Sequence, residues 1–272
     1  MINLYYNTNN EDSKCNWVMD SLKQGWPKTQ IADRDSPVAT PGAYWGFIQN
    51  NWVLIEQHQD LEIDWWFWDM PYWGRWNGLK EAQDPLQKFY WRVSKNSIHE
   101  TVIVNRPADR FQDWRLTIEP WKRTGSEIVI CPSSNTMSNW CSGLDETGWV
   151  DKTVTELKKH TDRPIRVRHK PRAKGTSGPN VALVPFAEDI KNAWAVVTSV
   201  SMCAVEAIAL GIPVFCDELS FAKPVAETEL SKIEQPKYAT RIRWFNHLAY
   251  CQFTQEEIKS GLAYRILNDK AS

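Results

Sequence analysis

Residues 193–218, AWAVVTSVSMCAVEAIALGIPVFCDE, constrain the fold more than any other stretch of this chain. An apolar run, a turn with serines, a small-residue run and a second apolar run follow one another. This order predicts a strand at 195–198, a helix at 201–210 and a strand at 212–216. Gly211 is expected to end the helix in the left-handed conformation that glycine adopts at such ends. A strand, a helix and a strand joined by short turns form the repeating unit of a parallel α/β sheet.

The rest of the C-terminal half continues this alternation. The patterns predict strands at 127–131, 164–167 and 181–185, helices at 149–160 and 187–193, and a polar loop at 132–143. Short connections between alternating strands and helices are typical of a doubly wound, mainly parallel sheet. Right-handed crossovers bring the strand-to-helix loops to the carboxyl edge of such a sheet, where ligands bind.

The N-terminal half predicts a second α/β lobe. Strands are expected at 2–6, 52–55 and 101–104, a helix at 11–23 and a turn-rich loop at 37–46. Near the C-terminus, helices are expected at 241–250 and from the capping box Thr254-Gln-Glu-Glu257 to about residue 267. We therefore expect one lobe at 1–125, a second lobe at 126–240, and C-terminal helices at 241–272 that pack back across the lobes.

Composition argues against several classes of protein. Of the 272 residues 42% are hydrophobic and 24% are charged, with a net charge of −1, so a polyanion would have to bind to a local basic patch. The sequence shows neither a basic and apolar leader nor an apolar run of about 18 residues, so we expect neither secretion nor a membrane span. Six cysteines without a C-x-x-C pair fit a reducing, cytoplasmic setting.

Several motifs that carry chemistry are absent from the sequence. It contains neither the glycine-rich fingerprints of dinucleotide and nucleoside triphosphate sites nor the G-x-S-x-G elbow of hydrolases. Its five histidines form no H-x-x-x-H pair and no Cys/His cluster. We therefore expect no metal and no resident cofactor.

Tryptophan is unusually frequent, with 16 residues, and the segment DWWFWDMPYWGRW at 64–76 is especially rich in it. Two interpretations stay open. In the first, the rings fill a hydrophobic core. In the second, they line a groove that binds sugar rings or unstacked bases.

A phosphate site is predicted where the strand at 195–198 meets the following helix. Ser199 and Ser201 lie beside free backbone N–H groups and the positive end of the helix dipole. Glu206 follows within two turns, close enough for its carboxylate to reach the hydroxyl pair of a ribose. The alternative is structural, because serine caps helices well and an alanine-rich helix packs closely.

A basic segment follows the predicted strand at 164–167. The sequence RVRHKPR gathers cationic and imidazole side chains at the same carboxyl edge as the serines, namely Arg166, Arg168, His169, Lys170 and Arg172. Guanidinium and ammonium groups at this edge would neutralise a diphosphate or follow a nucleic-acid backbone. The alternative is a solvated basic loop. Together with the serines, the segment predicts a phosphorylated ligand.

The two motifs together resemble the C-terminal lobe of GT-B-fold glycosyltransferases. The matching residues are the basic loop His169, Lys170 and Pro171 (with the lysine inserted), the serine loop Ser199 and Ser201, and the E-A-(x)3-G-x-P-V run from Glu206 to Val214. This resemblance covers about residues 126–220. It implies an α/β protein made of two Rossmann-like lobes of GT-B type with doubly wound, mainly parallel sheets.

Two further stretches, FWDMPYWGR and QFTQEEIKSGLAYRIL, resemble compact glycosyltransferase-like proteins of tailed bacteriophages. Some enzymes of that kind glycosylate hydroxymethylated pyrimidines in DNA. The resemblance therefore implies hydroxymethylcytosine or a related base in double-stranded DNA as an acceptor, and the cytoplasm of the host as the location. Other acceptor hydroxyls stay open.

The resemblance also implies roles on the donor side. The donor is a nucleotide sugar, expected to be a UDP-sugar, and no metal is needed because basic side chains and a helix N-terminus hold the diphosphate. The residues implied for the donor phosphates are Arg168, His169, Lys170, Arg172, Ser199 and Ser201, and the residue implied for the ribose is Glu206.

Roles on the acceptor side follow in the same way. Asp69 is the expected catalytic base, with Asp35, Asp64 and His58 as competitors. The residues expected to contact the acceptor are Trp68, Tyr72, Trp73 and Arg75, and those expected to contact DNA phosphates are Arg92, Lys95, Arg106 and Arg110.

Two other functions stay open. UDP-sugar 2-epimerases share the GT-B fold, so an epimerase or hydrolase of nucleotide sugars is one alternative, and it would turn over its substrate without an acceptor. A non-catalytic nucleic-acid-binding protein is the other, and its binding to DNA would weaken steeply with salt.

Overall fold

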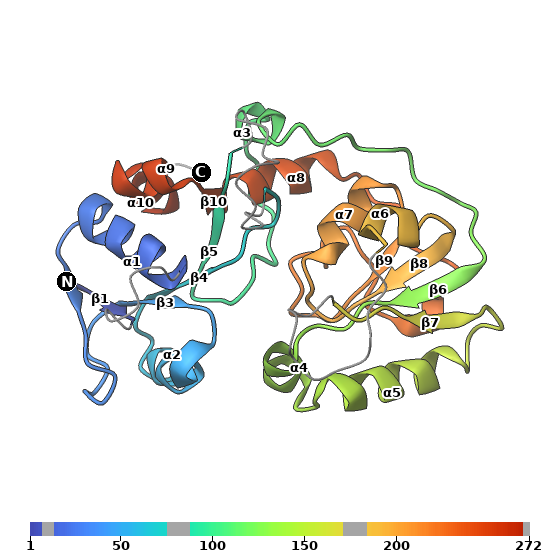
Figure 1. Cartoon of the computed structure of the whole chain (residues 1–272), viewed down its shortest axis with the longest axis horizontal. Coiled ribbons are helices and arrows are strands. Elements are labelled where there is room, and N and C mark those ends of the chain that lie inside the picture. The colour runs from blue at the N-terminus through green and yellow to red at the C-terminus, as the bar shows by residue number, and fades with distance from the viewer. Residues whose placement is uncertain (7–13, 75–87, 171–183, 269–272) are drawn as a thin grey trace. The chain divides into compact units, whose positions relative to one another are not determined.

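The structure is a computed structural model that describes residues 1–6, 14–74, 88–170 and 184–268 (Figure 1). The chain divides into two compact units. The N-terminal unit comprises Met1–Glu100, Val104–Trp114 and Phe245–Ser272, and the C-terminal unit comprises Thr101–Ile103 and Arg115–Trp244. The predicted boundary between the lobes at 125/126 differs from the boundary between the compact units, which lies at 114/115.

The N-terminal unit is built on a six-stranded sheet with the order β10-β5-β4-β3-β1-β2. Strands β1 to β4 are parallel, while β5 and β10 are antiparallel to their neighbours. The strands are β1 Ile2–Tyr5, β2 Thr29–Ile31, β3 Gly42–Trp45, β4 Trp65–Asp69, β5 Trp91–Lys95 and β10 Gln252–Phe253. The helices are α1 Lys14–Gly25, the 3-10 turn η1 Ile48–Asn50, α2 Asn51–Asp60, α3 Asp109–Gln112, α9 Gln255–Lys259 and α10 Leu262–Asn268, with most of α8 Ile242–Ala249.

Residues Trp65–Asp69 of the tryptophan-rich segment form the central strand β4. Side chains alternate across a strand, so Trp66 and Trp68 pack into the core with α1, while Phe67 points to the other face and meets Phe47. Trp65 is buried as well. Because both faces of a parallel sheet are covered, its central strands read as continuous apolar runs. For this strand the core interpretation is therefore confirmed.

The stretch at 52–55 was predicted as a strand, and this prediction is wrong. Residues of α2 are buried at Asn51, Leu54, Ile55 and His58, a spacing that puts them on one face of a helix. A short apolar run cannot by itself distinguish a strand from a buried helix. The predicted loop at 37–46 likewise contains β3, and the predicted strand at 101–104 is irregular.

The C-terminal segment completes the N-terminal unit. Strand β10 pairs with β5, and Gly25 of α1 lies so close to α9 that a Cβ on it would come within 1.8 Å of the Ile258 carbonyl oxygen. The predicted capping box is confirmed, because Thr254 accepts from the Glu257 N–H and Glu257 accepts from the Thr254 N–H. The predicted single helix is two helices, since Gly261 has a φ of +75° between α9 and α10.

The C-terminal unit is built on a four-stranded, all-parallel sheet with the order β7-β6-β8-β9. Figure 1 shows α5 on one side of this sheet and α6 and α7 on the other. The predicted doubly wound sheet is confirmed. The strands are β6 Glu127–Ile130, β7 Ile165–Val167, β8 Ala193–Val197 and β9 Val214–Phe215, and the helices are α4 Asn135–Ser142, α5 Glu146–Leu157, α6 Phe186–Asp189, α7 Cys203–Ala209 and the 3-10 turn η2 Leu230–Lys232.

The elements of this unit differ from the prediction in several places. Helix α4 lies within the predicted polar loop at 132–143, and α5 begins three residues earlier than expected. Ala193, predicted at the end of a helix, begins β8. Most of the strand predicted at 181–185 lies outside the described residues.

Gly211 supports a testable prediction about stability. Its φ is +73°, as expected for a helix end, and a Cβ would lie 2.0 Å from the Pro120 carbonyl oxygen, because the segment at 119–122 hydrogen-bonds to Ala209 and Gly211. Gly143 has a φ of +70°, and a Cβ added to it would meet no atom within 4 Å. We expect Gly211→Ala to lower the free energy of unfolding by about 2 kcal/mol more than Gly143→Ala. Urea unfolding of both variants tests this, and equal losses would contradict the close approach.

Candidate functional site

The order of the strands marks one place on the C-terminal unit. The chain runs from β6 outward to β7 and then returns across β6 to β8, so the order reverses between β6 and β8. In open α/β sheets ligands bind at the carboxyl ends of strands on either side of such a reversal. We call this place the switch-point edge and define it by Ser133, His169, Lys170, Ser201 and Glu206, which follow the strands at this edge.

The two predicted serines have different surroundings. Ser199 is fully buried, and its hydroxyl donates to the Ser133 hydroxyl at 2.6 Å. The prediction that Ser199 contacts a phosphate is therefore corrected, because its hydroxyl joins the ends of β6 and β8 instead. Ser201 is only half-buried and lies before the first residue of α7. Ser133 had no part in the prediction, because only the pairing of β6 with β8 brings it to Ser199.

Glu206 is a half-buried carboxylate on α7. Burial raises its pKa, and the positive charge of Arg168 acts in the opposite direction. None of the described residues forms a hydrogen bond or an ion pair with the carboxylate of Glu206. A carboxyl group in this setting is suited to hydrogen-bond the hydroxyls of a ligand.

The arginines of the basic segment form an internal network of ion pairs. Arg166 binds Glu127 with two hydrogen bonds of 3.0 and 3.1 Å and also contacts Asp189. Arg168 donates from Nε to Asp189 at 2.6 Å, and its side chain is 12% exposed. The hydrogen bonds from Arg166 to Glu127 raise the pKa of Arg166. Carboxylates already neutralise the guanidinium groups of Arg166 and Arg168, whose main role is to hold β7 against β6 and α6. The prediction that Arg168 binds donor phosphates is therefore corrected in part.

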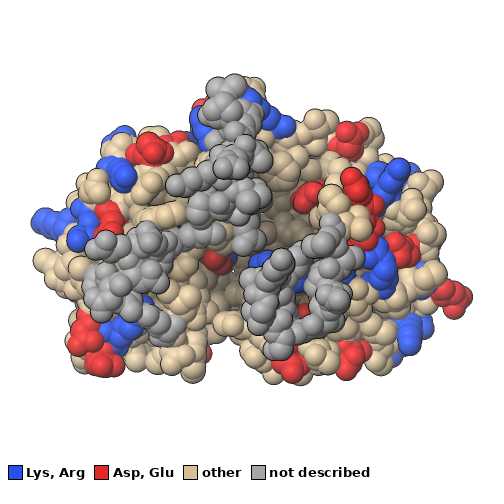
Figure 2. All heavy atoms as spheres, viewed as in Figure 1, with Lys and Arg blue, Asp and Glu red and all other residues tan. Residues whose placement is uncertain are grey.

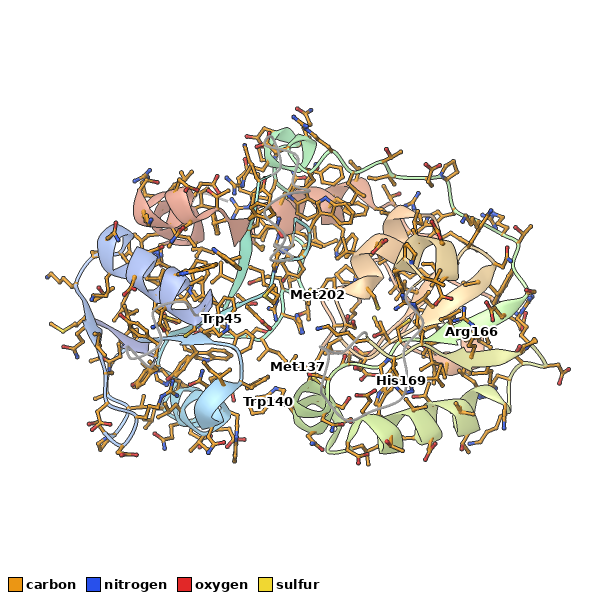
Figure 3. All side chains as sticks on the ribbon, in the orientation of Figure 1. Trp45, Met137, Trp140, Arg166, His169 and Met202 are labelled. Carbon is orange, nitrogen blue, oxygen red and sulfur yellow. The ribbon has the colours of Figure 1, made fainter. Side chains whose placement is uncertain are left out.

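The end of the basic segment is more accessible. His169 is half-buried and its Nδ1 lies 2.7 Å from Oε1 of Glu146, while Lys170 is exposed. Arg172 lies outside the described residues. In Figure 3, His169 lies beyond β7, with Met137 and Trp140 on α4 and Met202 at the start of α7. Met137, Trp140 and Met202 are half-buried.

Asp217 was also missed by the sequence analysis. It follows β9 and its N–H donates to the Ser199 carbonyl at 3.2 Å, which places it near the buried serine. Burial raises the pKa of Asp217, and a hydrogen bond from the Trp149 side chain opposes this. No local motif pointed to this residue.

The predicted acceptor residues are mostly core residues of the N-terminal unit. Trp68 and Tyr72 are buried, so the prediction that their rings contact an acceptor is corrected. Trp73 is half-buried, and its indole N–H donates to the Trp114 carbonyl at 3.0 Å. Arg75 lies outside the described residues.

The proposed base Asp69 is held at the end of β4. It accepts from the Met70 N–H at 2.7 Å and from Arg92 at 3.0 Å, and its side chain is 29% exposed. Arg92 is almost fully buried and also donates to the Ile98 carbonyl. The structure thus gives Asp69 a structural partner, and its role as a base stays a prediction.

The competing bases and the predicted DNA contacts are placed as follows. His58 is buried against Tyr44, Asp64 pairs with Lys95, and Asp35 is exposed. The prediction that Arg92 and Arg110 contact DNA phosphates is corrected. Arg92 is buried, and Arg110 is held by Glu257 and by the carbonyls of Ala249 and Gln252. Figure 2 shows acidic and basic side chains interspersed on the face in view.

A further cluster of titratable groups lies in the N-terminal unit. Ligand atoms of Glu100, His247 and Cys251 lie within 4.8 Å of one another. His247 Nδ1 accepts from the Val104 N–H, so the neutral ring carries its hydrogen on Nε2, which lies 3.6 Å from the Cys251 sulfur. A metal would need that nitrogen without its hydrogen. We therefore interpret the cluster as a hydrogen-bonded core group.

None of the helices in the described part of the chain has the length and apolar character needed to cross a bilayer.

No family model matches the chain, and a search of curated proteins found no match. Among solved structures, the KpsC β-Kdo 2,4 transferase of Thermosulfurimonas dismutans matches with a TM-score of 0.52 and 11% identity, over 93% of this chain and 91% of that chain. The two chains share a fold. A β-Kdo 2,7 transferase of KpsC from the same organism has a TM-score of 0.47 and 11% identity, over 97% of this chain and 98% of that chain.

Proposed function

We propose that this protein is a glycosyltransferase that binds a nucleotide sugar at the switch-point edge and transfers the sugar to an acceptor hydroxyl. One observation carries the proposal: the reversal of strand order in the C-terminal unit brings Ser133, Ser201, His169 and Glu206 to a single edge. The fold shared with a chain titled a β-Kdo transferase supports it.

The groups at this edge suit a nucleotide donor. His169, Lys170 and Ser201 would donate to the phosphates, and Glu206 would accept from the ribose hydroxyls. In the transfer the bond from the sugar to the phosphate oxygen breaks, and its electron pair stays on the phosphate. Hydrogen bonds and positive charge placed at that oxygen stabilise the charge that develops there. The acceptor oxygen forms the new bond, and a base, Asp69 in our proposal, takes its proton.

The proposal leads to specific donors and acceptors to test. Kdo is one sugar to test because the chain that shares the fold is titled a Kdo transferase. A UDP donor and a hydroxymethylated DNA base stay predictions from the sequence. The burial of Trp68 and Tyr72 removes two of the contacts on which the DNA acceptor rested.

A calorimetric screen without metal tests the donor site. The panel contains UMP, CMP, UDP, CDP, GDP and their sugar conjugates, with Kdo among the sugars. We expect one nucleotide to bind saturably and its affinity to fall about tenfold in Ser201→Ala or Lys170→Ala, the loss of a hydrogen bond to a charged group. Ser231→Ala and Lys191→Ala change exposed residues of the same unit and serve as controls. If no nucleotide binds to folded protein, the proposal is wrong.

A further inference from the structure

We propose that Glu146 is a positioning residue for His169: its carboxylate holds the imidazole by Nδ1 and thereby turns Nε2 toward the phosphates of the donor. The proposal rests on the proposed function for the identity of the ligand. The contact between the two side chains stands independently of it.

The geometry of the pair is that of a directed hydrogen bond. His169 Nδ1 and Glu146 Oε1 are 2.7 Å apart, a distance typical of a hydrogen bond to a charged acceptor. The Glu146 side chain is 13% exposed and that of His169 is 32% exposed. The two ring nitrogens point in different directions from the imidazole, so a bond at Nδ1 leaves Nε2 available to a ligand. No described residue is a partner of Nε2.

Two helices fix the position of Glu146. It is the first residue of α5, its N–H donates to the Asn135 side chain of α4 at 2.9 Å, and Asp145 caps the helix by accepting from the Gly148 N–H. A carboxylate in the first turn of a twelve-residue helix is favoured by the helix dipole. Glu146 is therefore anchored through its backbone, and His169 is oriented from α5 rather than from its own segment.

This arrangement has a chemical consequence at the ligand. With Glu146 as the acceptor, the hydrogen of a neutral ring is kept on Nδ1, since the bond at one nitrogen sets the state of the other. A second proton then enters at Nε2, where the N–H points away from Glu146. Only this doubly protonated ring presents a donor, at Nε2, to a phosphate oxygen.

The same helix carries a matched control pair. Near its other end, Glu156 Oε1 lies 2.9 Å from Nε2 of His160, and Lys159 shares the carboxylate. This pair joins the same residue types, with Glu156 on α5 and His160 after the end of the helix, and is not part of the switch-point edge. Changes at Glu156 therefore report on the general effect of removing a carboxylate from the helix.

The first arm of the test is nuclear magnetic resonance on ligand-free protein with ¹⁵N-labelled histidine, with His169 assigned through His169→Gln. We expect wild-type His169 to carry hydrogen on Nδ1. Glu146→Gln should shift the ring toward the other tautomer, Glu146→Asp should retain part of the wild-type signal, and Glu156→Gln should leave His169 unchanged. An unchanged His169 spectrum in Glu146→Gln would overturn the positioning role.

The second arm is the affinity for the nucleotide that binds best to wild-type protein in the calorimetric screen. We expect it to weaken about tenfold in Glu146→Gln, less in Glu146→Asp, and less than twofold in Glu156→Gln. If Glu146→Gln binds the nucleotide as tightly as the wild type does, the positioning role is contradicted and the proposed function is not. Absence of nucleotide binding in the wild type would overturn the proposed function and the phosphate role of His169, and the first arm would still decide whether Glu146 sets the ring.

Discussion

Lowering the pH from 7 to 5 is expected to destabilise the N-terminal unit and to spare the C-terminal unit. The N-terminal unit buries His58, His99 and His247. Burial lowers the pKa of all three, that of His247 to about 4. The C-terminal unit holds the other two, His160 and His169, which are only half-buried and lie beside carboxylates.

The direction of the effect follows from the pKa difference. In the unfolded chain histidine titrates near pH 6.5. Between about pH 6.5 and pH 4 the unfolded chain binds a proton at His247 and the folded chain does not, so stability that is fully present above pH 6.5 is lost as the pH falls. At pH 5 the depressed pKa of His247 lowers the free energy of unfolding by about 2 kcal/mol relative to neutral pH. His58 and His99 act in the same direction.

Carboxyl groups with a raised pKa act in the opposite direction. Such a group binds a proton more readily in the folded chain, so it adds stability as the pH falls. Burial raises the pKa of Glu206 and Asp217 in the C-terminal unit. In the N-terminal unit burial also raises the pKa of Glu100, and this offsets part of the stability that the histidines lose.

Hydrogen exchange with mass spectrometry at pH 7, 6 and 5, corrected for intrinsic exchange rates, measures each unit separately. We expect peptides of β1, β3 and β4 to lose protection before those of β6 and β8. His247→Asn keeps an acceptor for the Val104 N–H and should reduce the pH dependence, while His160→Asn should not change it. Simultaneous loss of protection in both units would contradict this account.

Arg92→Met is expected to lower the free energy of unfolding of the N-terminal unit by about 3 kcal/mol. The guanidinium of Arg92 is buried, bonds to Asp69 and the Ile98 carbonyl, and lies 5.3 Å from the ring centre of Phe67. Its loss leaves a carbonyl and part of a carboxylate without a partner, and breaking a buried ion pair in this way costs about 3–5 kcal/mol. Asp69 is partly exposed, so the lower end of that range applies.

Lys95→Met is the matched control on the same strand. Lys95 pairs with Asp64 at 2.7 Å, but both side chains are about a third exposed or more, and we expect a cost of at most about 1 kcal/mol. In urea unfolding followed by hydrogen exchange, the double variant Arg92→Met/Asp69→Asn should lose less than the sum of the single variants. Additive losses would show that Asp69 is not the partner that makes Arg92 costly to remove.

Sequence patterns predicted the C-terminal sheet well because its elements are locally coded. The apolar runs of β6 and β8 are short and are bounded by polar turns. They alternate with segments whose apolar residues have helical spacing. In the N-terminal unit the same rules gave the wrong type for α2, because a four-residue apolar run fits either a strand or a buried helix face. The edge strand β10 was also missed, since two residues of pairing with β5 leave no local signal.

The candidate site was predicted only where the chain is continuous. Ser201 and Glu206 follow one another in a recognisable turn and helix. The bond between Ser133 and Ser199 joins residues 66 apart and appears only when β6 and β8 pair. Glu146 could have been found, because Asp145 before the helix is a good N-cap, and placing the helix start at 149 hid it. The neutralisation of Arg166 and Arg168 depends on Asp189 of α6 and has no sequence motif.

We propose that a nucleotide sugar binds at the switch-point edge of the C-terminal unit. Hydrogen exchange of the whole protein, with and without the nucleotide that binds best, tests it most directly. We predict that added protection will be strongest in peptides that cover Ser133, His169 and Ser201 to Glu206, and that Ser201→Ala will reduce it. Protection confined to other peptides, or none at a saturating concentration of nucleotide, would contradict the claim.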